Sequence, residues 1–307
     1  MKQDSIIRMR WCGVAFYEIV LPDGTVIITD PAQYQYPENM VAEKDYLRYS
    51  DRSAADILDR VDYIIISHTH FDHVQDLTQV INKFPDARII VPDTTAVTLL
   101  LEKNYSTLSR NFFVAGHMDE LRFPNFTLQS FAGKHTVFAS TDPFLKNFRE
   151  QDFRKDFKNE DGSTDYIKSM FWAAGGIDPR NYLITTPDGV KLFIWAGQIG
   201  EDFRKFIYHD MCPHAMFVQI AGTNIGGDRT NPKADLIGEF TMNVNPQIVL
   251  PIHQEKYTKD CLELIKTRCN EYYAQNNSSI KYENPEVYEW FELYVNENGK
   301  AEIVSGK

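Results

Sequence analysis

The sequence predicts an α/β fold in which buried strands alternate with amphipathic helices. Residues 61–67 are a run of β-branched and aliphatic side chains, which is typical of a strand buried on both faces. Residues 75–84 then change to a helical period. The apolar residues on one face of that helix are Leu77, Val80, Ile81 and Phe84. A second strand at 87–91 and a second helix at 94–105 repeat the order, which favours helices layered on a sheet.

The chain before this unit predicts a hairpin. Residues 11–20 are apolar and aromatic, and residues 25–29 return as a strand. Pro22, Asp23 and Gly24 lie between them. Proline fixes φ for a turn, aspartate bonds to nearby backbone, and glycine accepts a positive φ, so this tripeptide indicates a tight turn.

The second half of the chain continues the mixture of strands and helices. The further strands are expected at 126–131, 192–195, 215–220 and 247–251. Helices are expected at 234–244 and 257–276, and the last hairpin turns at 297–300. The buried face of the last helix is predicted to hold Leu262, Ile265, Cys269 and either Tyr272 or Tyr273.

Residues 140–181 differ from the rest of the chain, because they are rich in charge and carry aromatic pairs at i, i+4 spacing. The segment is interpreted as a helical insertion that covers the active site or a partner subunit. A surface excursion with a small core of its own is the alternative. We expect one domain over 1–307, with residues 257–307 forming a C-terminal helix and hairpin.

Composition narrows the possible partners. The net charge of −11 disfavours nucleic acid and anionic membranes, which both require a basic face. The four cysteines form no C-x-x-C pair and resemble free thiols of a reducing compartment. No apolar run is long enough to span a membrane, and the start lacks a signal-peptide core. These features predict a cytoplasmic protein acting on a small molecule, with a homo-oligomer left open.

Three of the eight histidines lie within six residues, directly after the strand at 61–67. His68 and His70 point to the same side of an extended segment and can bind one ion. Asp72 and His73 follow and can supply an oxygen and a nitrogen to a second ion. This set suits zinc, and also iron or manganese. A chance surface cluster is disfavoured, because histidine is rare and the spacing falls at a strand-to-helix junction.

The pattern H-x-H-x-D-H after a buried strand resembles the signature of the metallo-β-lactamase superfamily. The segments at 11–13 and 28–31 resemble the branch of L-ascorbate-6-phosphate-lactonase-like hydrolases. The resemblance spans about residues 8–256 and implies a four-layer αββα sandwich. It also implies that the first ion is held by His68, His70 and His135, and the second by Asp72, His73 and His253.

One position departs from the family pattern. The family bridges its two ions with an aspartate, and the matching position here is Gln198. A neutral amide oxygen bridges two cations poorly and removes one negative charge from a shielded site. We therefore hypothesise that one ion is bound tightly and the second weakly or not at all. The alternative is that Glu201 or Asp202 reaches into the site instead.

The resemblance implies a metal-dependent hydrolase in which metal-bound hydroxide attacks an ester, lactone, amide or phosphoester. If the second ion is absent, Asp72 is the candidate catalytic base. One alternative is a degenerate metal-binding scaffold that lost catalysis through Gln198. Another is an iron-dependent oxidoreductase of the same superfamily.

The remaining polar candidates lie outside this motif. Asn224 and Asp228 follow the strand at 215–220, and loops at such strand ends commonly contact substrate. His117 is interpreted as a turn residue. His209 and His214 are given a structural or surface role, with substrate binding as the alternative. Only the position of Cys12 near a strand suggests a nucleophile there.

Overall fold

The computed structural model describes residues 4–33, 53–68, 71–74, 76–92, 111–133, 179–197, 211–220, 224–225, 228–232 and 234–305. Within these ranges, only the backbone is described for residues 71–72, 224–225, 228–232, 256 and 305. The predicted helix at 94–105 and most of the predicted insertion lie outside the described residues.

The first sheet has eight strands in the order β17-β16-β1-β2-β3-β4-β5-β6. Their bounds are β1 (Ser5–Gly13), β2 (Phe16–Val20), β3 (Val26–Thr29), β4 (Tyr63–Ile65), β5 (Arg88–Pro92), β6 (Phe112–Ala115), β16 (Trp290–Val295) and β17 (Ala301–Ser305). The strands from β3 to β6 run parallel to one another, whereas those from β17 to β3 pair antiparallel.

The second sheet has seven strands in the order β15-β14-β11-β10-β9-β8-β7. Their bounds are β7 (Glu120–Arg122), β8 (Thr127–Ala132), β9 (Arg180–Thr185), β10 (Lys191–Trp195), β11 (Ala215–Gln219), β14 (Ile248–Ile252) and β15 (Lys281–Tyr282). Here β10, β11, β14 and β15 are parallel. A separate ribbon joins β12 (Asn224–Ile225) to β13 (Asp228–Pro232).

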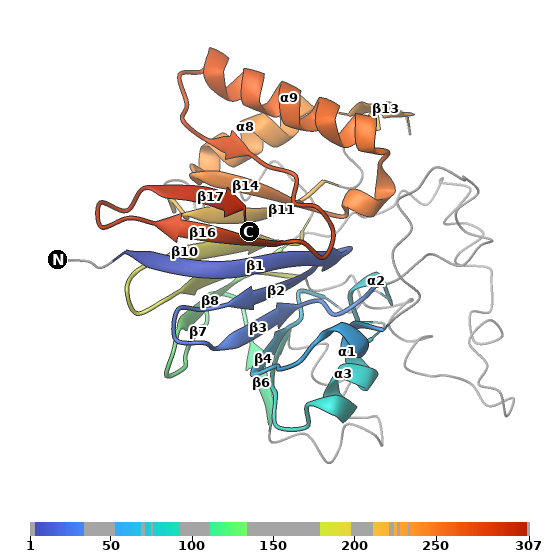
Figure 1. Cartoon of the computed structure of the whole chain (residues 1–307), viewed down its shortest axis with the longest axis vertical. Coiled ribbons are helices and arrows are strands. Elements are labelled where there is room, and N and C mark those ends of the chain that lie inside the picture. Colours follow the sequence, from blue (N-terminus) through green and yellow to red (C-terminus); the bar gives the residue numbers. More distant parts are fainter. Residues whose placement is uncertain are drawn as a thin grey trace, which may run out of the picture.

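The strands of these sheets are buried on both faces, because the two sheets lie in the middle of the molecule. Along β10, Leu192 and Ile194 face the core between the sheets, whereas Phe193 and Trp195 belong to the core shared with α8 (Ala234–Val244) and α9 (Lys259–Gln275). Figure 1 shows α8 and α9 at the top of the view, beyond the second sheet. The run of apolar residues without alternation follows directly from this double burial.

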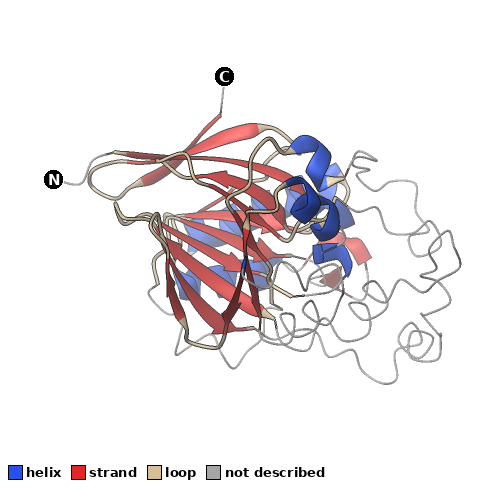
Figure 2. Ribbon diagram, turned by 90° about the horizontal axis from the view of Figure 1, so that it is seen from below, coloured by secondary structure: helices blue, strands red, loops and turns tan. Residues whose placement is uncertain are grey.

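The first sheet is covered in the same way on its other side. Along β4, Tyr63 and Ile65 face the core between the sheets, and Ile64 packs with α1 (Ala54–Ile57) and α3 (Leu77–Lys83). Figure 1 places α1 and α3 at the bottom, and Figure 2 shows helices both in front of and behind the strands. The predicted αββα sandwich is therefore confirmed.

The hairpin predicted around Gly24 is confirmed, because β2 and β3 pair across it and Gly24 has a φ of 85°. The single strand predicted over 11–20 is wrong. Gly13 and Val14 turn the chain between β1 and β2, with φ values of 125° and 47°. The sequence does not indicate this turn, because its residues are as buried and apolar as the strands it joins.

The C-terminal elements match their predictions closely. Helix α8 has the predicted bounds, and α9 begins after Thr258, whose Oγ1 accepts a hydrogen bond from the Cys261 N–H at 3.3 Å. The buried tyrosine of α9 is Tyr273, while Tyr272 is only half-buried. The last hairpin joins β16 to β17 and turns at Gly299, where φ is 78°.

Six strands were not predicted: β6, β7, β9, β12, β13 and β15. The first two are short and largely half-exposed, so they carry little apolar alternation. Strand β9 begins at Arg180 and Asn181, inside the segment predicted as an insertion. None of the described helices is long and apolar enough to cross a membrane.

The four cysteines are free, as the sequence predicts, and Cys212 is exposed while Cys12, Cys261 and Cys269 are buried. Burial also raises the pKa of the Cys12 and Cys269 thiols, which keeps them protonated. We therefore expect a thiol-specific colorimetric reagent to titrate one thiol in the native protein and all four after denaturation. Cys212→Ser should leave no fast-reacting thiol, and rapid reaction of a second thiol in native protein would contradict the packing described above.

Candidate metal centre

The carboxyl ends of strands from both sheets meet at one place and carry a cluster of polar side chains. Asp30 follows β3, Ser67 and His68 follow β4, and His253 follows β14. His73 comes from the short helix α2 (Phe71–Val74). All five side chains are at most 2% exposed. Buried polar groups gathered at strand ends are the usual position of a site in folds with parallel strands.

Asp30 holds His73 in one orientation. Its Oδ2 lies 2.9 Å from His73 Nδ1 and accepts a hydrogen bond from the Ser67 hydroxyl at 2.6 Å, while its Oδ1 accepts from the Ser67 N–H at 2.7 Å. Because a carboxylate accepts, His73 carries its proton on Nδ1 and its lone pair on Nε2. This is the arrangement in which a carboxylate orients a histidine toward a metal ion.

The same serine connects Asp30 to His68. Since the Ser67 hydroxyl donates to Asp30, its oxygen accepts from His68 Nδ1, 3.0 Å away. His68 therefore also carries its lone pair on Nε2. The imidazoles of His68 and His73 lie close together, with ring centroids 3.9 Å apart.

His253 approaches from the second sheet with a carboxylate of its own. Its Nδ1 lies 3.0 Å from Glu255 Oε1, and its Nε2 lies 3.3 Å from Nε2 of His73. Both imidazoles therefore donate to carboxylates through Nδ1 and direct Nε2 at each other. Two lone pairs at this distance repel unless a proton or a cation lies between them.

The spacing of these two nitrogens fits a shared divalent ion. Two nitrogens bound to a tetrahedral zinc ion at 2.0–2.1 Å lie about 3.3 Å from each other. The donor set is equally suitable, since neutral imidazoles fixed by carboxylates are the common ligands of zinc and related ions. The residues present therefore fit a divalent metal ion held jointly by His73 and His253.

The backbone around the cluster is strained. Val14, Asp30 and His253 have φ values of 47°, 37° and 62°, in a region that residues with a side chain rarely adopt. The His253 N–H donates to the carbonyl of Val14 at 2.8 Å, so two of these residues stabilise each other across the sheets. Backbone strain concentrated in this way is typical of functional sites.

Of the predicted ligands, the structure brings together His68, His73 and His253. Those outside the described residues are His70, His135, Gln198 and the side chain of Asp72. Among the side chains that are described, no three of the types His, Cys, Asp and Glu form a group able to hold a metal ion. The complete ligand set therefore stays a prediction. Within the described residues, two of its members, His73 and His253, face each other through their Nε2 atoms.

The predicted substrate contacts lie on the ribbon: Asn224 begins β12 and Asp228 begins β13, with side chains outside the described residues. His117 is confirmed as a turn residue, with Nδ1 accepting from the Ala132 N–H at 3.0 Å. His214 has a structural role, because its Nδ1 accepts from the Lys191 N–H at 3.0 Å and joins β11 to β10. His209 lies outside the described residues.

Cys12 is unsuited to act as a nucleophile. It is fully buried, and burial raises the pKa of its thiol well above the usual range. A protonated, inaccessible thiol does not attack a substrate.

Three functional candidates were missed in the sequence. Asp30 lies in a strand end that resembles the family, but no role was assigned to it. Glu255 follows His253 by two residues, and this spacing is a signal that could have found it. Asn181 is buried, and its Oδ1 accepts from the N–H groups of Ala196 and Gly197 at 3.1 and 3.2 Å. It thereby fixes the backbone just before Gln198.

The family model described as the metallo-β-lactamase superfamily matches residues 9–220. The chain belongs to this superfamily. A metal-dependent hydrolase of Koribacter versatilis is 28% identical over 90 residues, which are 29% of this chain and 34% of the relative. A metal-dependent hydrolase of Anaeromyxobacter sp. strain K is 40% identical over 71 residues, 22% of this chain and 21% of the relative. The chain thus matches about a third or less of these relatives' length.

Solved structures share the fold at low sequence identity. A metallo hydrolase of the archaeon Ignicoccus hospitalis aligns over 98% of this chain and 100% of its own, with a TM-score of 0.55 and 14% identity. CmlA, a diiron β-hydroxylase of Streptomyces venezuelae, aligns over 96% of this chain and 54% of its own, with a TM-score of 0.51 and 12% identity. At such identities the likeness concerns the fold alone.

The facing imidazoles predict how two substitutions combine. His73→Ala and His253→Ala should each weaken binding of the shared ion by at least about 100-fold, since a direct ligand contributes more than the 10–100-fold of an outer-shell partner. The double variant should lose little more than either single variant, because both remove the same ion. Zinc titration against a competing chelator measures these affinities.

His117→Ala is the matched control, since His117 lies in a turn and bonds to Ala132. It should leave zinc affinity unchanged. Loss of a different ion in each single variant, with both ions lost in the double variant, would show that His73 and His253 bind separate ions.

Proposed function

We propose that this protein is a metal-dependent hydrolase of a small molecule. The observation that carries the proposal is the pair of carboxylate-bound imidazoles, from His73 and His253, whose Nε2 atoms lie 3.3 Å apart. The names of the matched relatives, which are metal-dependent hydrolases, support the same activity. Zinc suits the ligands best, and manganese or iron are alternatives.

A bound divalent ion supplies a Lewis acid that polarises the substrate and activates a water molecule near neutral pH. The chain's own contribution is orientation. Asp30 fixes His73 directly and His68 through Ser67, and Glu255 fixes His253. The proposed substrate carries an ester, lactone, amide or phosphoester bond, and the resemblance to the ascorbate-phosphate lactonases favours a small polar molecule.

Asp72 has two proposed roles, depending on the ion count. With two ions it is a ligand beside His73. If the ion shared by His73 and His253 is absent and only the ion at His68, His70 and His135 is bound, Asp72 orients the water and accepts its proton. The two roles differ in a measurable way, because only loss of a ligand changes metal content.

Two other functions follow from the same centre. The fold shared with the diiron β-hydroxylase CmlA is compatible with iron chemistry, so oxidation is the rival reaction. A metal-binding scaffold without catalysis is the rival to any enzyme, and it is motivated by the neutral Gln198. We place the hydrolase first, because the relatives that match in sequence are named metal-dependent hydrolases.

The proposal is tested with a panel of chromogenic esters, lactones, amides and phosphodiesters. Hydrolysis should occur with at least one class, disappear after metal removal by a chelator, and return with zinc or manganese. Asp72→Asn should lower the rate by roughly 100- to 10,000-fold, the usual contribution of a general base, and metal content should stay unchanged if Asp72 acts as a base and not as a ligand.

His117→Ala is again the control, and it should retain full activity. Absence of hydrolysis across the panel by metal-loaded protein would favour the scaffold. Asp72→Asn protein that loses metal would assign Asp72 as a ligand rather than a base.

Gln198 makes a separate prediction about the number of ions. An amide contributes no charge between two cations, so we expect one tightly held ion per chain by elemental analysis. Gln198→Asp should restore the bridging carboxylate and raise the count to two. Two tightly held ions in the unaltered protein would contradict the proposed effect of Gln198.

A further inference from the structure

Glu255 is a buried carboxylate with only one polar contact among the described residues. It lies in the 3-10 helix η2 (Gln254–Lys256), two residues after His253, and its side chain is 5% exposed. Its Oε1 lies 3.0 Å from His253 Nδ1. Its Oε2 is also buried and has no hydrogen-bond partner among the described residues. A carboxylate is costly to bury, so its position requires an explanation.

We propose that Glu255 is a positioning residue of the metal centre, which orients His253 and supplies a fixed negative charge to the ion that His253 holds. This inference rests on the proposed function, because it assumes that His253 is a metal ligand. It assigns a role to a residue outside the histidine motif and outside the ligand set that the resemblance implies.

The first argument is the correspondence between the two imidazoles. His73 extends from the side of the first sheet with Asp30 at its Nδ1, and His253 extends from the second sheet with Glu255 at its Nδ1. The two Nε2 atoms then meet at 3.3 Å. A carboxylate behind a ligating histidine fixes the ring and strengthens its lone pair. Because each imidazole has a carboxylate at its Nδ1, we infer that Glu255 orients His253 as Asp30 orients His73.

The second argument is the difference between the two carboxylates. Asp30 shares its charge with two hydrogen bonds from Ser67 in addition to His73. Glu255 directs Oε1 to His253, and no described donor reaches Oε2. Its charge is therefore less dispersed by local donors and acts more strongly on His253. Within the shielded interior, such a charge favours a bound cation.

The third argument is the backbone of His253. Its φ of 62° is left-handed, and it is the N-cap of η2, so the chain turns sharply at the ligand and brings Glu255 back beside it. The His253 N–H is held by the Val14 carbonyl at 2.8 Å. The turn thus fixes the ring and its carboxylate as one unit. A simple helix cap would not require the carboxylate to meet the ring nitrogen.

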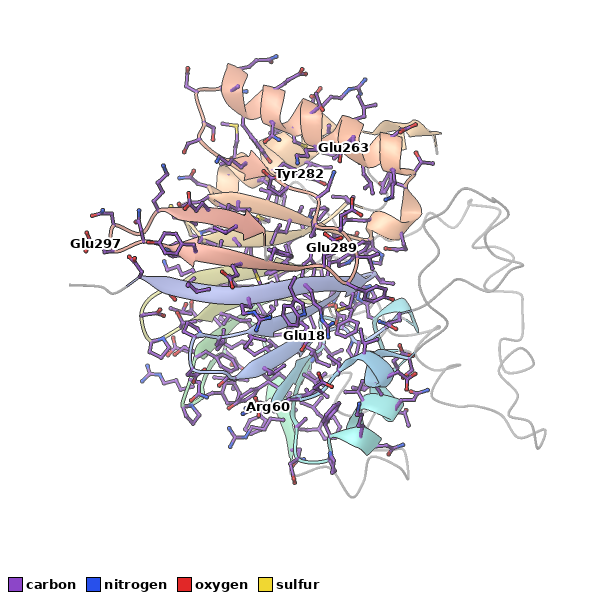
Figure 3. The ribbon with its side chains drawn as sticks, viewed as in Figure 1. Glu18, Arg60, Glu263, Tyr282, Glu289 and Glu297 are labelled. Carbon is purple, nitrogen blue, oxygen red and sulfur yellow. The ribbon has the colours of Figure 1, made fainter. Side chains whose placement is uncertain are left out.

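The experiment compares Glu255→Gln and Glu255→Ala in the full-length chain. The glutamine retains the shape and one acceptor oxygen but removes the charge, whereas alanine removes both. The matched control is Glu18→Gln. Glu18 is another buried carboxylate, 6% exposed, which accepts from Arg10 Nε at 2.7 Å on β2, and Figure 3 shows it on that strand.

Three quantities are measured for each protein: zinc affinity against a competing chelator, the visible spectrum of the cobalt-substituted protein, and the unfolding midpoint of the metal-free protein. Glu255→Gln should weaken zinc binding by about 10- to 100-fold and shift the cobalt bands, and Glu255→Ala should weaken it further. Glu18→Gln should leave affinity and spectrum unchanged. The metal-free unfolding midpoint of Glu255→Gln should fall no further than that of Glu18→Gln.

Unchanged zinc affinity and cobalt spectrum in Glu255→Gln would overturn the inference. A lower unfolding midpoint with unchanged affinity would also overturn it, because the carboxylate would then be a structural cap. These readouts need no substrate. If zinc affinity and the cobalt spectrum depend on Glu255 but the protein hydrolyses nothing, the proposed function fails and the role of Glu255 stands.

Discussion

The separation between His73 and His253 depends on how the two sheets pack. One imidazole is fixed from the first sheet through Asp30, and the other follows β14 of the second sheet. Two further contacts lock the sheets near this point: the Tyr17 hydroxyl donates to the carbonyl of Pro251 at 2.9 Å, and the His253 N–H donates to Val14 at 2.8 Å. The spacing of 3.3 Å is therefore a property of the whole sandwich rather than of one loop.

This dependence explains why strain can persist at the centre. Left-handed backbone costs on the order of 1–3 kcal/mol for each residue with a side chain, and three such residues surround the site. That sum is a large share of the roughly 5–15 kcal/mol by which a protein is stable. The core between the sheets supplies the compensating burial. An ion bound only by the folded state adds further stability through mass action.

The sequence was most informative where one short segment carries the whole signal. The double-sided burial of 61–67, the helix α8 and the motif from His68 to His73 are all local patterns. Asp30 was missed as a partner of His73, because 43 residues separate the two and only the pairing of β3 with β4 brings them together. Strand β9 was missed because it begins with Arg180 and Asn181. Polar residues of these types are usually exposed, although both are buried here.

The positions of the carboxylates around the histidines affect how many metal ions the centre can hold. Asp30 and Glu255 lie at the Nδ1 atoms of His73 and His253, on the side of each ring away from the facing Nε2 atoms. Charge placed there strengthens each ring as a donor to an ion held by both. It does little to reduce the repulsion between two neighbouring cations, which a bridging carboxylate at position 198 would do. Neither these two carboxylates nor the neutral Gln198 relieves the repulsion between two neighbouring cations, and both support the proposal that two ions are not held equally tightly.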